Sequence, residues 1–139
     1  MKHWLTFALV TTLFWGTTPI LDRLAMGRAQ PMAAVAVRGV VVGLVSVLIV
    51  AATGKMGDLA ALDRRTVLLL AAGGLLAALV GQFTYFRALK MGPASAVVPI
   101  VACYPLVTVM LGILVLREPL TLSRAGGALL IVLGILLVK

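Results

Sequence analysis

The chain has 139 residues, of which 63% are hydrophobic and 12% are charged, and its formal net charge is +8. A soluble domain is typically about 45–50% apolar and about 25% charged. The composition therefore excludes an ordinary water-soluble protein and predicts an all-α integral membrane protein with a single domain, residues 1–139. The Lys and Arg residues lie mostly at the ends of apolar runs. We accordingly expect the lipid bilayer, and no nucleic acid, as a partner.

The N-terminus combines a basic start with an apolar run, as a secretory signal peptide does. The run from Trp4 to Leu21 is 18 residues long, and no clear small-x-small cleavage site ends it. It is longer than the apolar core of a typical signal peptide. We therefore interpret it as a retained first membrane span.

Five apolar runs follow one another along the chain, and each approaches the ~20 residues that cross ~30 Å of hydrocarbon. They predict a bundle of five transmembrane helices at about 4–24, 33–53, 66–88, 95–116 and 122–138.

Residues typical of turns separate the runs, at 27–31, 54–65, 90–93 and 117–121. Two of them have predicted structural roles. Pro93 opens the fourth helix, where proline is favoured near the first turn, and Glu118 lies in the last turn beside Arg117.

Small residues at spacings of four suggest close helix packing. Gly39 and Gly43 form a GxxxG match in the second run, and Gly73 and Gly81 belong to a ladder in the third. Such ladders let membrane helices approach closely. The contact they make is either within the chain or with another subunit, and the sequence leaves both open.

The basic residues are divided evenly between the two sides that five spans would create. Six lie on the side of the N-terminus, counting Lys2, and six on the other, counting Lys139. Because orientation normally follows a Lys/Arg excess, this balance allows insertion both ways round and an antiparallel dimer. If Arg38 and Arg87 are omitted because they lie within helices, a mild bias remains with the N-terminus inside.

Arg38 lies about six residues into the second run, where a buried guanidinium is costly. It is either an interfacial anchor that snorkels to the headgroups or a cavity cation that pairs with an acid or an anionic substrate. Asp22 and Glu118 lie near helix ends beside arginines. We interpret both as structural charges rather than as parts of a proton relay.

Polar and aromatic residues occur together late in the third run. Gln82 lies three and four residues from Tyr85 and Phe86, so these side chains share one helix face. They either line a cavity or form an interfacial aromatic belt. The predicted contacts to a substrate in the cavity are made by Thr18, Arg38, Gln82, Tyr85 and Tyr104.

The sequence offers no set of residues for catalysis or for metal binding. Cys103 is the only cysteine and His3 the only histidine. No nucleophile with its base, no acid pair and no phosphate-binding glycine loop is evident. We expect no enzyme activity, no cofactor and no metal site.

Pro99 and Pro105 lie inside the fourth apolar run. Each removes a backbone donor and can bend the helix, freeing carbonyls near Ser95 and Val101. Freed carbonyls in a membrane are tolerated when they are buried in protein or face a wet cavity. The fourth helix is therefore predicted to be central and to border a transport path, although the prolines can also simply shape packing.

The second half of the chain resembles the second half of an EamA repeat, the repeat that typifies the drug/metabolite transporter superfamily. The resemblance rests on an ALxxGPAS segment, two later prolines, an ExLT turn and a glycine-rich last helix. In this sequence the matching residues are Ala88, Leu89, Gly92, Pro93, Ala94, Ser95, Pro99, Pro105, Glu118, Leu120 and Thr121. Trp15 and Gly16, followed by Arg23 and then Arg38, fit the first half.

The resemblance implies a five-helix half-transporter of the short bacterial and archaeal branch. Such a half would work with a second copy of itself or with a paralogous half, in a bacterial inner membrane. It would move a small metabolite or drug-like solute by alternating access. The related small multidrug resistance family has an acid within its first helix, where this chain has Leu13 and Phe14. The alternative interpretation is a non-transporting subunit that assembles with another membrane complex or regulates it.

Overall fold

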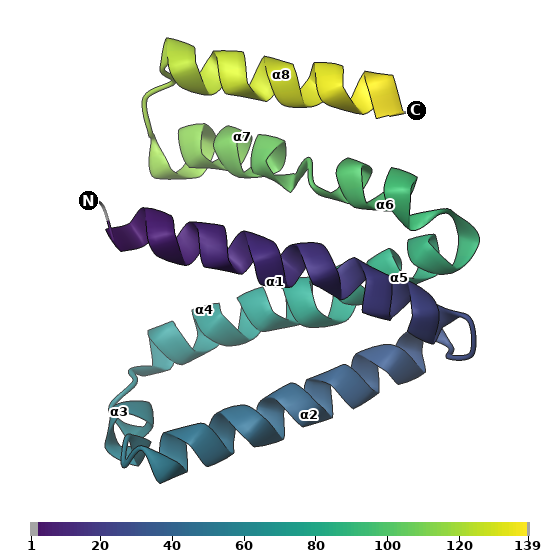
Figure 1. Cartoon of the computed structure of the whole chain (residues 1–139). Coiled ribbons are helices and arrows are strands. Elements are labelled where there is room, and N and C mark those ends of the chain that lie inside the picture. Colours follow the sequence, from purple (N-terminus) through teal and green to yellow (C-terminus); the bar gives the residue numbers. More distant parts are fainter. Residues whose placement is uncertain (1–2, 139) are drawn as a thin grey trace. The chain divides into compact units, whose positions relative to one another are not determined.

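The computed structural model describes residues 3–138, so Lys2 and Lys139 of the charge count lie outside it. Its first element is α1 (His3–Met26), a 24-residue helix that contains Pro19. A four-residue turn leads to α2 (Pro31–Ala52), which has proline at its N-terminus, a position where the missing N–H costs nothing. The two helices form a hairpin (Figure 1).

A short connection that the hydropathy did not resolve follows α2. Gly54 adopts a left-handed φ of 70°, and the amide of Lys55 donates to the carbonyl of Val50 over 3.0 Å. This bond closes the end of α2 in a Schellman-type cap. The predicted loop 54–65 then contains a further short helix, α3 (Met56–Ala60).

The third apolar run forms one continuous helical rod with a change of winding in its middle. It comprises α4 (Arg64–Gly74), the π-helix η1 (Leu75–Gly81) and α5 (Gln82–Met91). The side chain of Asp63 accepts from the amides of Arg65 and Thr66 and so caps the first turn. A π-helix of seven residues is unusual, because most occur as single-turn bulges.

The residues from Gly92 onward form a second compact unit with three helices. They are α6 (Ala94–Val101), α7 (Tyr104–Leu116) and α8 (Leu122–Val138). The fourth apolar run is interrupted at Ala102 and Cys103, immediately before Pro105, which occupies the N-terminus of α7. Both α6 and α7 pack against α8.

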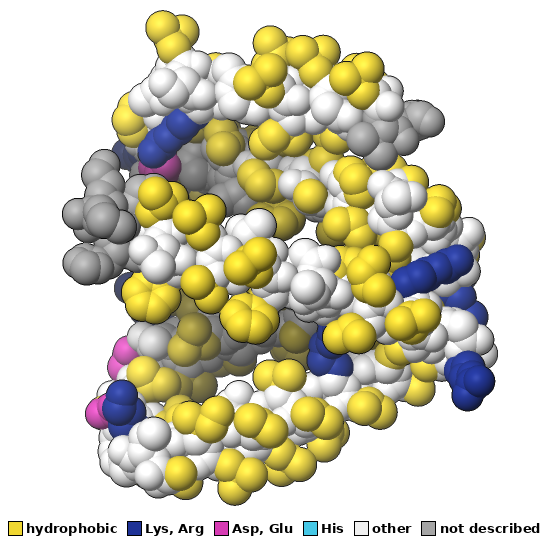
Figure 2. Space-filling view, viewed as in Figure 1, with side chains coloured by type: hydrophobic (Ala, Val, Ile, Leu, Met, Phe, Trp, Pro, Cys, Tyr) yellow, Lys and Arg dark blue, Asp and Glu magenta, His cyan; other side chains and the backbone are white. Residues whose placement is uncertain are grey.

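The core of the first unit, which ends at Met91, is small and lies where α5 packs against α1 and α2. Its buried apolar side chains are Met26, Val35, Phe86 and Leu89. Large hydrophobic side chains are exposed along the long helices, and many are visible on the face drawn in Figure 2. Because water would not tolerate so large an apolar surface, lipid must be the solvent of these faces.

Three helical runs of the described residues are long and apolar enough to cross a membrane. They are Pro31–Ala52, Arg64–Met91 and Ala94–Leu116, with mean hydropathies of 2.5, 2.0 and 2.3. The predicted all-helical membrane fold is therefore confirmed, and the chain is a multi-pass membrane protein. Helices also occupy the predicted first and last runs, but five crossings and a single domain stay predictions.

Candidate functional site

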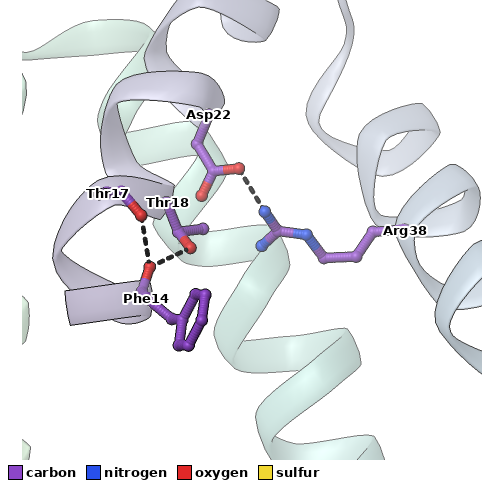
Figure 3. Close-up of polar contacts among 5 residues, drawn as sticks. All are labelled: Phe14, Thr17, Thr18, Asp22 and Arg38. Carbon is purple, nitrogen blue, oxygen red and sulfur yellow. Dashed lines mark hydrogen bonds and ion pairs between the residues drawn. The ribbon is translucent and has the colours of Figure 1, made fainter. Parts of the chain in front are cut away.

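The end of α1 gathers polar side chains around a proline. The hydroxyls of Thr17 and Thr18 both donate to the carbonyl of Phe14, each over 2.9 Å (Figure 3). Pro19 has no N–H to donate to the carbonyl of Trp15, four residues earlier in the helix. Threonine hydroxyls that donate to the preceding turn tend to bend a helix. This segment positions Asp22 one turn later.

Asp22 of α1 forms an ion pair with Arg38 of α2. The guanidinium Nη2 of Arg38 donates to Oδ1 of Asp22, as drawn in Figure 3. The Asp22 side chain is only 6% exposed, whereas that of Arg38 is 35% exposed. An ionised carboxylate buried to this degree requires a partner, and Arg38 supplies it.

α5 provides the aromatic wall of the same cluster. The guanidinium carbon of Arg38 lies 5.0 Å from the centre of the Phe86 ring, which is a cation–π geometry. Phe86 is 2% exposed, and the neighbouring Tyr85 ring lies 6.0 Å from it between centroids. Arg38 is thus held by a carboxylate on one helix and an aromatic face on another.

Two polar atoms of this unit are buried without a hydrogen-bond partner among the described residues. They are Oδ2 of Asp22 and Nε2 of Gln82. A buried polar atom normally has a partner, and leaving one without costs about 1–3 kcal/mol. One atom is a free acceptor and the other a free donor, so a polar solute or ordered water is the natural complement of each.

A second arginine fastens α1 to α5. Arg23 follows Asp22 in sequence, and its Nη1 donates to the backbone carbonyl of Leu89. Leu89 is fully buried. This contact holds the end of α5 against α1. The face of α5 that carries Phe86 is thereby kept against Arg38.

Thr18, Arg38, Gln82 and Tyr85 of the predicted cavity residues therefore belong to the unit that contains the ion pair. Thr18, Gln82 and Tyr85 are half-buried. Tyr104 belongs to the second unit, where it begins α7 and is 56% exposed. Their contact with a substrate stays a prediction.

The predicted bending residues surround the interruption of the fourth run. Pro99 lies inside α6, and its carbonyl accepts from the Cys103 thiol over 3.2 Å. Pro93 is the N-cap residue of α6, and its carbonyl accepts from the amides of Ala96 and Val97. Pro105 is the second residue of α7, so its missing N–H falls where a helix leaves donors unpaired anyway.

The turn between α7 and α8 is held by a salt bridge. Nη1 of Arg124 donates to Oε2 of Glu118 over 3.0 Å and to the carbonyl of Pro119 over 3.2 Å. Arg117 adopts a left-handed φ of 55°, and the amide of Glu118 donates to the Gly112 carbonyl. Glu118 therefore fastens the turn to the first residues of α8.

The glycines predicted to pack closely lie mostly at open positions. A Cβ added at Gly39, Gly43 or Gly73 would meet no atom within 4 Å, and the same holds at Gly16, for which a structural role is predicted. At Gly81 it would lie 3.1 Å from the carbonyl oxygen of Leu76 within the π-helix. Trp15 is 65% exposed on α1. The packing role of the four glycines at 39, 43, 73 and 81 and the structural role of Trp15 and Gly16 stay predictions.

The pairing of Asp22 with Arg38 was missed by the sequence reasoning, which placed Asp22 beside Arg23. A usable signal existed in the spacing from the turn. Asp22 lies four residues before the end of α1, and Arg38 lies seven residues after the start of α2. In a tight hairpin, residues at these distances from the turn lie close enough for their oppositely charged side chains to meet.

The cluster combines charged and polar groups with aromatic rings, and it lacks the composition of a metal site. No group of three metal-ligating side chains occurs among residues 3–138. An acid, a guanidinium, an amide and two aromatic rings offer electrostatic, hydrogen-bonding and stacking contacts instead. In a membrane-spanning segment such ionisable residues mark substrate or ion pathways more often than not.

Comparison with known proteins identifies a family whose model matches nearly the whole chain. The model of the EamA-like transporter family matches residues 2–139. An uncharacterized transporter from the cobO 3′ region of Sinorhizobium sp. is 33% identical over 136 residues, which is 98% of this chain and 96% of that protein. An uncharacterized protein of Methanocaldococcus jannaschii is 43% identical over 60 residues, covering 43% of this chain and 44% of its own. No solved structure matches the chain.

Proposed function

The chain belongs to the EamA-like transporter family, and we propose that it is a half-transporter that moves a small metabolite or drug-like solute across a bacterial inner membrane. All five apolar helical runs cross the bilayer in this proposal, and two copies, or one copy and a paralogous half, complete the transport path. The two halves rock around a central site and so expose it alternately to each side. The protein performs no covalent chemistry on the solute.

The observation that carries the proposal is the buried ion pair of Asp22 and Arg38 with its unpartnered carboxylate oxygen. Placing both charges in a membrane segment is costly, and a purely structural contact could be made more cheaply by apolar packing. Oδ2 of Asp22 and Nε2 of Gln82 are left for a ligand to satisfy. Thr18 and Tyr85 border this region in the proposal. Contact of Tyr104, which belongs to the second unit, with the solute stays a separate prediction.

A second copy is supported by the open glycine face of α2. Gly39 and Gly43 lie one turn apart, and neither would meet any atom within 4 Å if it carried a Cβ. Such a face allows another helix to approach closely. A Val40→Cys, Cys103→Ser variant should form a disulfide-linked dimer in membranes, and adding Gly43→Leu should abolish this cross-link.

Counterflow in liposomes tests the transport function. Wild-type protein would be reconstituted and loaded with one unlabelled amino acid, sugar, nucleoside or cationic drug at a time, and entry of the labelled compound would be followed. At least one class should exchange, and Asp22→Asn and Arg38→Gln should reduce that exchange at least tenfold. Arg124→Gln removes an exposed arginine from a surface pair and serves as the matched control.

Two results would overturn the proposal. One is the absence of exchange for every compound although the protein is folded and inserted. The other is exchange that both cluster variants leave unchanged. The first result would favour a non-transporting subunit of another membrane complex.

A further inference from the structure

A groove lies at the end of the first unit where α2 begins and α5 ends, away from the Asp22 carboxylate. Gln30, Pro31 and Met32 form one side of it, and Phe83, Arg87, Lys90 and Met91 form the other. The groove therefore combines two cationic side chains with an apolar aromatic and thioether surface. This combination is unlike that of the polar cluster, which contains an acid.

The two cationic side chains of the groove, Lys90 and Arg87, differ in their hydrogen bonding. The ammonium of Lys90 donates to the carbonyl of Ala29 and to Oε1 of Gln30, each over 3.1 Å. An ammonium has three donors, so one remains. Arg87 is exposed and makes no side-chain hydrogen bond or ion pair within residues 3–138. Lys90 is thus held in place beside a guanidinium whose donors are all free.

The surroundings of the groove are strongly positive. Arg23 and Arg28 belong to the same end of the unit, and the nearest acid in the sequence, Asp22, is buried and paired with Arg38. Dark blue side chains gather around the α1–α2 turn at the right of Figure 2, whereas magenta ones near α3 mark the other end of this unit. Asp58 and Asp63 lie beyond the 22 residues of α2, which is about 33 Å of helix.

We propose that this groove binds the phosphate headgroup of an anionic phospholipid. The run Arg64–Met91 is long and apolar enough to cross the bilayer, so Arg87 and Lys90 fall at its interfacial end. There the two cations face the depth at which lipid phosphates lie, and basic pockets between membrane helices bind such headgroups. Phe83 and Met32 supply apolar surface against which the start of an acyl chain packs. The proposal needs only membrane insertion and is independent of transport.

Native mass spectrometry of the full chain tests it directly. The protein would be released from vesicles of equal phosphatidylglycerol and phosphatidylcholine, and the lipids that remain bound would be counted. Wild-type protein should retain phosphatidylglycerol preferentially. An Arg87→Gln, Lys90→Gln variant should lose about thirtyfold in relative affinity, since each basic residue near the surface contributes about fivefold.

The same helical run provides the matched control. Arg64→Gln, Arg65→Gln also removes two positive charges, but from the opposite end of the run and outside the groove. This variant should retain phosphatidylglycerol as the wild type does. Equal loss in both variants would overturn the proposal, because it would show general attraction by net charge. Circular dichroism of each variant checks that the helices remain formed.

Inorganic phosphate distinguishes a lipid from a free anion. The apolar side of the groove should make the lipid the better ligand, so phosphate at millimolar concentration should not displace phosphatidylglycerol. Displacement by phosphate alone would overturn the lipid assignment. Retention of phosphatidylcholine and phosphatidylglycerol in equal amounts by the wild type would overturn the site itself.

Discussion

Arg38 of α2 reaches back across the α1–α2 hairpin and donates to Asp22 of α1, while its guanidinium lies over the Phe86 ring of α5. One side chain therefore connects the three helices that form the small core of the first unit. Because so little apolar surface is buried in that core, a polar contact has a larger share in holding the helices together than it would in a soluble domain.

A double-mutant cycle on Asp22 and Arg38 measures how much their interaction contributes to the free energy of unfolding. Asp22→Asn and Arg38→Gln should each lower the free energy of unfolding in detergent by about 2–3 kcal/mol, because each leaves a partner unpaired. The double variant should lose clearly less than the sum of the two. Thermal and denaturant unfolding provide the measurement. Additive losses would show that the two side chains do not interact.

The π-helix leads to a prediction about two glycines of the same rod. Gly73→Ala should raise the free energy of unfolding by about 0.5–1 kcal/mol, because alanine is the better helix former and nothing lies within 4 Å of the new Cβ. Gly81→Ala should lower it, because the new Cβ would meet the Leu76 carbonyl oxygen at 3.1 Å. The comparison of the two melting temperatures tests whether η1 keeps its winding.

A gain of stability in Gly81→Ala equal to that in Gly73→Ala would contradict this prediction. It would mean that the segment returns to α-helical winding without cost. Far-ultraviolet circular dichroism should show unchanged helix content in both variants, so that the difference in stability is assigned to the local contact.

The hydropathy of the chain predicts its helices well because lipid selects for length and apolarity. α2 begins at Pro31 and ends at Ala52, against a predicted 33–53, and the fourth run, Ala94–Leu116, begins one residue earlier than predicted. The π-helix could not be predicted, since its residues are as apolar as their neighbours and hydropathy carries no information on winding. The short α3 was missed because the loop 54–65 has no apolar run of sufficient length.

The candidate site was predicted only in part, because sequence periodicity relates residues on one helix and not across helices. Gln82, Tyr85 and Phe86 lie on one helix, α5, as their spacing indicates, and their contact with a substrate stays a prediction. The partner of Arg38 depends on the hairpin geometry of α1 and α2, and the adjacent Arg23 was the misleading choice. Arg23 instead donates to the Leu89 carbonyl, a contact that no pattern of charges predicts.

Arg117 gives a prediction for the end of α7. Among residues 3–138, it is the one non-glycine residue with a positive φ, which is 55°. It occupies the C-terminal cap of α7, a position where glycine is usual. Arg117→Gly should stabilise the protein by about 1 kcal/mol, because glycine adopts this conformation without the steric cost of a Cβ. Arg117→Ala is the control, since it removes the same charge and keeps the Cβ. Equal melting temperatures of the two variants would show that the strain is absent.

Asp63 gives a prediction for the pH dependence of the start of α4. Hydrogen bonds from the Thr66 hydroxyl and from the amides of Thr66 and Arg65 hold the pKa of the Asp63 carboxyl below its usual range. A carboxyl whose pKa is lowered in the folded state stabilises that state above its unfolded pKa of about 3.9. This stabilisation is lost as the pH falls through the folded value.

Hydrogen exchange at low pH tests this cap at the two amides it binds. In the wild type, protection of the Arg65 and Thr66 amides should decrease as the pH is lowered from 5 to about 2, after correction for the intrinsic exchange rate. In Asp63→Asn, whose amide side chain still accepts a hydrogen bond but does not titrate, protection should stay constant over the same range. A parallel decrease in both proteins would place the titrating group elsewhere, because the asparagine variant has no carboxyl at this helix start.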